Sequence, residues 1–111
     1  MSLLDSLQQR YSERNALVRV ELEGIEPFWF QPVYSITPVQ RSKLDKLHAN
    51  LSMDNAADVL VFRARNEDGT KMFNGNDVEK IKSLTLSTDL ESMIQEMIRI
   101  DAEGEQEKKD C

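Results

Sequence analysis

Residues 17–30 read LVRVELEGIEPFWF, and this stretch carries the clearest strand pattern of the chain. Apolar and charged side chains alternate over residues 17–22, a pattern typical of a half-buried β-strand. Residues 23–27 contain the glycine and proline of a turn region, and residues 28–30 return to strong β formers. The sequence therefore predicts a two-stranded hairpin. Pro32 places the second strand at an edge or ends it, because proline cannot donate to a ladder.

Helical patterns lie on both sides of this hairpin. Before it, apolar residues of segment 2–15 recur at spacings of one, three and four, which predicts an amphipathic helix. After it, residues 37–40 read TPVQ and combine a capping box with a proline in the first helical turn. We also expect a helix over residues 55–65, although its run VLVF, residues 59–62, is also typical of a buried strand.

The second half of the chain predicts two more helices. Asn76 precedes a short apolar pattern and is the expected N-cap of the first. A capping box at residues 88–91 opens the second, which carries the widest apolar stripe of the chain. Gly104 predicts the end of that helix, because glycine is preferred just after a helix. Residues 104–111 are polar and charged, so we expect them to form a flexible acidic tail.

These patterns together predict an α+β fold that is mostly helical. It consists of an N-terminal helix, a two-stranded β-hairpin and about four further helices, in a single domain over residues 1–103. The chain has 111 residues, and domains commonly contain about 100–150. We expect no membrane segment, because the longest uninterrupted apolar run is far shorter than the ~20 residues that cross a bilayer.

Charge and cysteine content exclude several classes of protein. Twenty acidic residues against 14 lysines and arginines give a formal net charge of −6. This excess of acid argues against binding to a phosphate backbone, so we expect no nucleic-acid partner. The single cysteine, Cys111, excludes an intramolecular disulfide framework and a cysteine-based zinc site. The sequence thus indicates a cytosolic protein.

No catalytic set and no cofactor site is visible in the sequence. Nucleophilic catalysis needs an activated nucleophile beside a base, and His48 is the only histidine. Residues 66–69, NEDG, invite comparison with a calcium loop, but Ala64 and Gly75 would occupy two of its ligand positions. We therefore interpret NEDG as a turn in which Gly69 adopts a positive φ. The prediction is a protein that is not an enzyme and needs no metal or cofactor.

Four apolar residues are candidates for contact with a partner protein. Trp29 lies on the second strand, and its side chain points to the opposite face of the strand from those of its two neighbours. It therefore faces either a second apolar layer or a partner. Met93 and Met97 lie on the last predicted helix, where methionine forms core and also adaptable binding surfaces. Ile98 extends the same stripe. The candidate partner-binding residues are thus Trp29, Met93, Met97 and Ile98.

The order of these patterns resembles the tail assembly chaperones of long-tailed bacteriophages. The matching stretch is residues 18–101, and its most specific part is NEDGTKMF at residues 66–73, followed by Asp77-Val78 and an apolar helix over 90–100. The resemblance implies a non-enzymatic chaperone in the host cytoplasm that is absent from the finished particle. Such a protein coats the tape-measure protein and keeps it soluble until tail-tube subunits polymerise around it. The tail-tube protein and a second copy of the chain are further candidate partners.

Two other classes of function stay open at the level of sequence. One is a permanent structural component of the phage tail, which would be present in purified particles. The other is a small acidic inhibitor directed at a host protein. Such an inhibitor should carry its acids in a continuous stripe on one face, whereas here they are scattered through every predicted helix.

Overall fold

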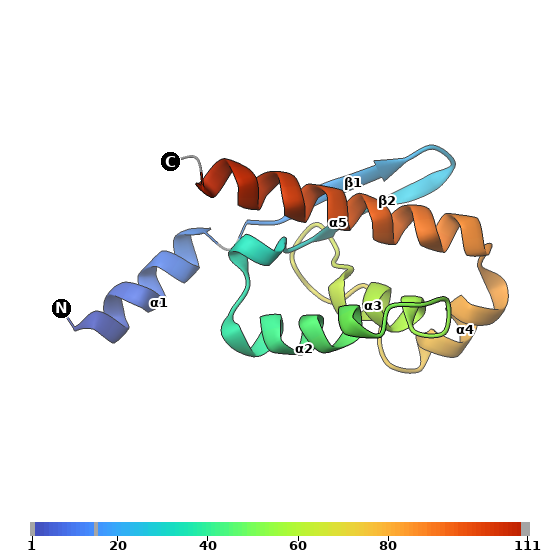
Figure 1. Ribbon diagram of the computed structural model, residues 1–111, viewed down its shortest axis with the longest axis horizontal. Helices are drawn as coiled ribbons and strands as arrows, with labels where there is room; N and C mark the ends of the chain where they lie inside the picture. Colours follow the sequence, from blue (N-terminus) through green and yellow to red (C-terminus); the bar gives the residue numbers. More distant parts are fainter. Residues whose placement is uncertain (1, 15, 110–111) are drawn as a thin grey trace.

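The computed structural model describes residues 2–14 and 16–109. In chain order its elements are α1 (Leu3–Arg14), β1 (Val18–Leu22), β2 (Ile25–Phe30), the 3-10 turn η1 (Val33–Ser35), α2 (Pro38–Ala49), α3 (Ala56–Arg63), α4 (Asp77–Leu84) and α5 (Ser87–Lys109). This is the predicted α+β fold: an N-terminal helix, one antiparallel hairpin and four helices after it (Figure 1). None of the helices in the described part of the chain has the length and apolar character needed to cross a membrane.

The hairpin confirms the predicted strand alternation. Val18 pairs with Phe30 and Val20 with Phe28 across the two antiparallel strands. The turn is tighter than expected, because Gly24 adopts a φ of 80° and β2 already begins at Ile25. Pro27, expected in the turn, lies instead within β2 at an irregularity of the register, where its missing N–H removes no ladder bond.

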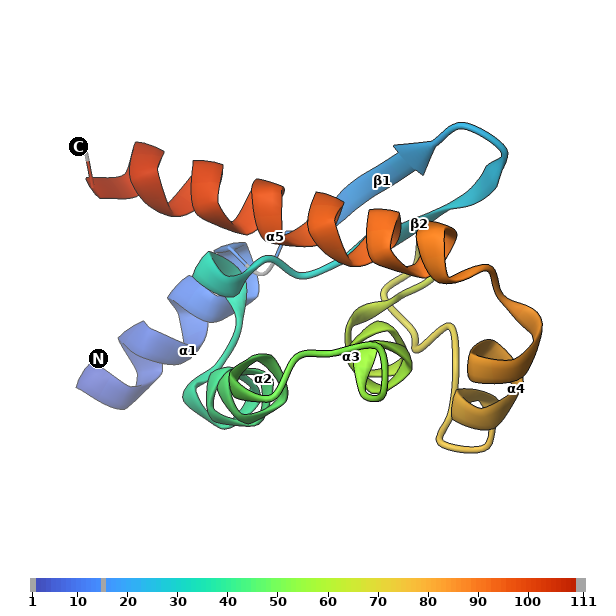
Figure 2. The ribbon, with the colours of Figure 1, turned by 45° about the vertical axis from the view of Figure 1, so that its right-hand side comes forward.

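The core lies between the hairpin, α3 and α5. Helix α5 runs across the hairpin and also packs against η1 and α3, while α2 and α4 flank α3 (Figures 1 and 2). The ambiguous run at residues 59–62 lies within α3 and is helical, as predicted, and small and aliphatic residues dominate the buried side of this helix. The larger buried apolar side chains are Val20, Phe28, Phe30, Leu44, Val59, Leu60, Ile81, Leu90, Met93, Ile94 and Met97.

The predicted capping interaction is present at the start of α2 but not at the starts of α4 and α5. The Thr37 side chain accepts the backbone N–H of Gln40, and the Gln40 side chain accepts that of Thr37, so the predicted capping box is confirmed. Asn76 precedes α4 but makes no side-chain capping bond. Helix α5 begins at Ser87, so Thr88 lies within the helix rather than at its cap.

The predicted end of the last helix at Gly104 is wrong. Helix α5 continues through this residue to Lys109, so residues 104–109 belong to a helix and not to the expected flexible tail. The remaining tail residues, 110–111, lie outside the described part of the chain. Gly104 has a packing role instead, since a Cβ atom there would lie 1.9 Å from Cε1 of Tyr34. Gly104 thus leaves room for the Tyr34 ring of η1 against α5 and does not end the helix.

Candidate protein-binding surface

The N-terminal helix presents three leucines to solvent. Leu3, Leu4 and Leu7 are 76%, 63% and 55% exposed, and their spacing places them on one face of α1. We call these three residues the leucine stripe. The helix projects from the body of the protein in both views, and no other element packs extensively against it (Figures 1 and 2). The stripe is therefore an apolar face that the described part of the chain leaves uncovered.

Short-range interactions contribute to the formation of this helix. The Ser2 hydroxyl accepts the backbone N–H of Asp5 at 3.1 Å, and Asp5 also places a negative charge in the first turn. Gln9 donates to the Glu13 carboxylate one turn further on, at 3.2 Å. Isolated helices shorter than about 12–15 residues are only marginally stable in water. A surface that covered the leucine stripe would therefore also stabilise the helix.

Other exposed apolar residues are more scattered than those of the leucine stripe. Val39 is exposed in the first turn of α2, and Leu84 and Leu86 are exposed at the junction of α4 and α5. Single exposed apolar side chains are common on monomeric proteins and need no special explanation. Leu84 and Leu86 nevertheless serve as a control, because they are about as exposed as the leucine stripe but lie elsewhere on the surface.

The structure places Met93, Met97 and Ile98 in or against the core. Met97 is fully buried and Met93 is 8% exposed, while Ile98 is half-buried against the same core. Met93 and Met97 thus expose almost no surface in this fold, and a partner contact at these positions stays a prediction. Helix α5 packs against β1, η1 and α3 at once, which requires a wide apolar face.

Trp29 is half-buried and engaged within the sheet. Its backbone N–H donates to the carbonyl of Arg65 at 3.0 Å, and the N–H of Arg65 donates back at 2.7 Å. The guanidinium of Arg19 lies 5.5 Å from the centre of the indole ring. The backbone beyond α3 thus extends the hairpin by one bridge, which the sequence did not reveal, and the indole has a cation as its neighbour.

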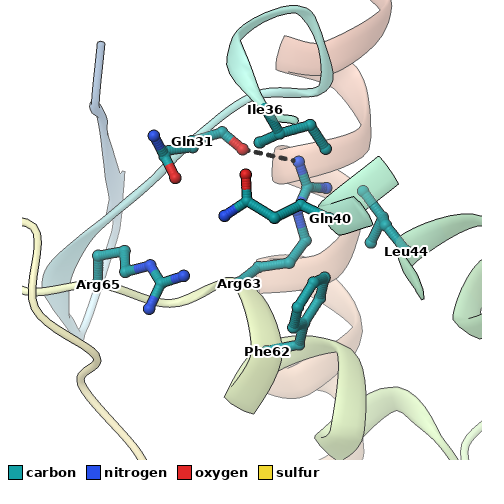
Figure 3. A pocket seen from close by; sticks show the side chains of 7 residues that line it. All are labelled: Gln31, Ile36, Gln40, Leu44, Phe62, Arg63 and Arg65. Atoms are coloured by element: carbon teal, nitrogen blue, oxygen red, sulfur yellow. Dashed lines mark hydrogen bonds between the residues drawn. The ribbon is translucent and has the colours of Figure 1, made fainter. Parts of the chain in front are cut away.

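An ion pair with full hydrogen bonding occupies the interior. Arg63 donates to both carboxylate oxygens of Asp101, at 2.7 and 2.9 Å, and to the carbonyl of Gln31 at 3.3 Å. Figure 3 shows this arginine beside the Phe62 ring and the Gln40 side chain, at a small cavity of about 20 Å³. That volume is enough for roughly one water molecule. The cluster therefore connects α3, α5 and the end of β2 but offers no room for a substrate.

The remaining polar candidates, His48 and the NEDG segment, have properties that their neighbours in the fold explain. His48 is half-buried, and burial followed by the charge of Arg63 lowers the pKa of its imidazole. Asp68 accepts the N–H and hydroxyl of Thr70, which lowers the pKa of the carboxyl. Gly69 has a φ of 91°, so the turn predicted for NEDG is confirmed. Within residues 2–14 and 16–109, no three histidine, cysteine or acidic side chains come together in a way that could hold a metal ion.

The sequence predicts the N-terminal helix and its apolar face, but it does not show whether that face is covered. The apolar spacing of residues 3–11 predicts an amphipathic helix and leaves open what its apolar side contacts. The short connection between α1 and β1 was a signal that this face is exposed, because β1 begins at Val18, only a few residues after α1 ends. So short a connection limits how far the helix can fold back onto the body.

Comparison of the chain with protein-family models, with curated protein sequences and with solved structures finds no match.

Proposed function

We propose that this protein is a non-enzymatic assembly chaperone that binds the tape-measure protein of a long-tailed phage and keeps it soluble during tail assembly. The observation that carries the proposal is the leucine stripe, an uncovered apolar face on a helix that stands away from the body. The identity of the partner rests on the resemblance of residues 18–101 to tail assembly chaperones. The proposal includes no chemical step and no cofactor.

Physical chemistry supports a binding role for the leucine stripe. Full burial of a leucine side chain stabilises a complex by about 1.5–3 kcal/mol, so three leucines provide a useful driving force. Binding would also hold α1 in its helical form, which water alone stabilises poorly. An apolar segment of the tape-measure protein would lose its own exposed surface in the same contact, and its tendency to aggregate would fall accordingly.

The acidic body gives the complex a second useful property. With a net charge of −6, each bound copy adds negative charge to the tape-measure protein, and like charge keeps complexes apart in solution. Binding to the unassembled form also raises its soluble concentration by mass action. We place this activity in the host cytoplasm, before tail-tube subunits replace the chaperone.

Co-expression tests the proposed function. The tape-measure protein of the same genome is produced with and without this chain, and its soluble fraction is measured. We expect the soluble fraction to rise and the two proteins to copurify, while purified phage particles lack the chain. A tape-measure protein whose solubility does not change would contradict the proposal. Stoichiometric presence in particles would favour a permanent tail component instead.

A further inference from the structure

A second apolar feature lies beside α3, at the edge of the core. It is an open groove of about 360 Å³ between α2, α3, α4 and the segment that leads into α4. Its apolar lining consists of Leu47, Val61, Phe62 and Val78, all half-buried. The groove is distinct from the leucine stripe, because no residue of α1 lines it.

Helix α3 carries more apolar side chains than its buried face uses. The charged residues in its sequence, AADVLVFR, are Asp58 and Arg63, and Arg63 is buried in the ion pair with Asp101. A helix at a surface usually has one polar face. Val59 and Leu60 are buried in the core, but Val61 and Phe62 line the groove. Both are half-buried, and the Lys43 ammonium lies over the Phe62 ring, so part of their apolar surface stays exposed in the described structure.

The charges at the rim favour an acidic occupant. Lys43 and Lys71 both line the groove and are exposed, and the ammonium of Lys43 lies 4.8 Å from the centre of the Phe62 ring. Asp58 is a half-buried acid in the same lining. Two lysines against one aspartate give a positive rim on a chain whose net charge is −6. This local reversal of sign would attract carboxylates to the groove.

We propose that the groove binds one amphipathic helix of a partner protein, with aliphatic side chains on the Val61 and Phe62 surface and carboxylates beside Lys43 and Lys71. A helix fits better than a strand, because the walls are helices and loop rather than a free sheet edge. Apolar anchors spaced by three and four residues are the usual way in which a helix occupies such a groove. The proposed role of this groove does not depend on whether the protein binds the tape-measure protein.

The test uses two designed helical peptides of about 18 residues with the same leucine stripe. One carries glutamates beside the leucines and the other carries lysines. Their binding is measured by fluorescence anisotropy against the full chain, against Lys43→Glu/Lys71→Glu, and against Arg10→Glu/Lys80→Glu. The last variant makes the same change of charge at exposed positions that do not line the groove. Circular dichroism checks that all three proteins are folded alike.

We expect the glutamate peptide to bind the unchanged protein and the Arg10→Glu/Lys80→Glu variant equally. Its affinity should fall about tenfold for Lys43→Glu/Lys71→Glu, because two attractions become repulsions. The lysine peptide should show the opposite preference. Equal binding of both peptides to all three proteins, or no saturable binding at about 1 mM, would overturn the proposal. Self-association of the unchanged chain that Lys43→Glu/Lys71→Glu abolishes would also overturn it, by showing that a second copy occupies the groove.

Discussion

Arg63 and Asp101 form a bidentate ion pair in the interior, although 38 residues separate them in the chain. Their side chains are only 3% and 9% exposed. The same carboxylate accepts the backbone N–H of Val33 at 3.0 Å, so one acid holds α3, α5 and η1 together. The ion pair thus connects these three elements in the interior, whereas the leucine stripe of α1 lies exposed at the surface.

Removal of either partner of this pair should destabilise the fold strongly. We expect Asp101→Ala to lower the free energy of unfolding by about 3–5 kcal/mol, because it leaves the buried guanidinium without its counter-charge. The double variant Arg63→Met/Asp101→Leu should recover most of the loss. As a control, Arg99→Ala on the exposed side of α5 removes ion pairs to Glu96 and Glu103 and should lower the free energy of unfolding far less than the change at Asp101, because solvent screens these pairs. Urea unfolding measures all of these values.

Met97 should behave as a core residue and not as a contact for a partner. Its side chain is fully buried, so Met97→Ala should lower the free energy of unfolding by about 2–5 kcal/mol. The control is Leu86→Ala, at the position just before α5. Its side chain is exposed, so the free energy of unfolding should change by no more than about 0.5 kcal/mol. A stable Met97→Ala protein with weakened partner binding would refute this assignment.

Gly104 should resist the substitution that usually stabilises helices. In an exposed helix, glycine to alanine gains about 1 kcal/mol. Here the new methyl would collide with the Tyr34 ring, so we expect Gly104→Ala to lower the free energy of unfolding by about 1–3 kcal/mol. In a Tyr34→Ala background the same change should become stabilising. If thermal unfolding shows a higher melting temperature for Gly104→Ala alone, the close approach of α5 and η1 is not present.

His48 should make stability depend on pH in the weakly acidic range. Burial, and then Arg63, lower its pKa in the folded protein below the ordinary value of 6.5. The unfolded chain therefore takes up a proton that the folded chain resists, and stability falls as the pH decreases below about 6.5. Urea midpoints at about pH 7.5 and about pH 5.5 measure this slope. His48→Gln should reduce it, and an unchanged slope in that variant would assign the effect to other groups.

Sequence patterns predicted the parts of the fold that local interactions determine. The hairpin alternation and the Thr37–Gln40 capping box involve residues close in the chain, and both are confirmed. The end of α5 was predicted wrongly, because the contact between Gly104 and Tyr34 joins distant residues and overrides the usual preference for glycine beyond a helix end. Periodicity showed which face of α1 is apolar, but no periodicity shows what covers that face.

The most direct test of the account is the affinity of leucine-stripe variants for the tape-measure protein, measured by quantitative copurification. Leu4→Gln/Leu7→Gln removes apolar surface but keeps helix propensity, since glutamine and leucine are similar in this respect. Leu84→Gln/Leu86→Gln makes the same chemical change at equally exposed leucines elsewhere.

We expect the first variant to unfold at the same urea concentration as the unchanged chain but to lose at least about tenfold in affinity, from the burial energy of two leucines. The second variant should bind like the unchanged chain. Full binding by Leu4→Gln/Leu7→Gln, or an equal loss in both variants, would contradict the claim that the leucine stripe is the binding surface.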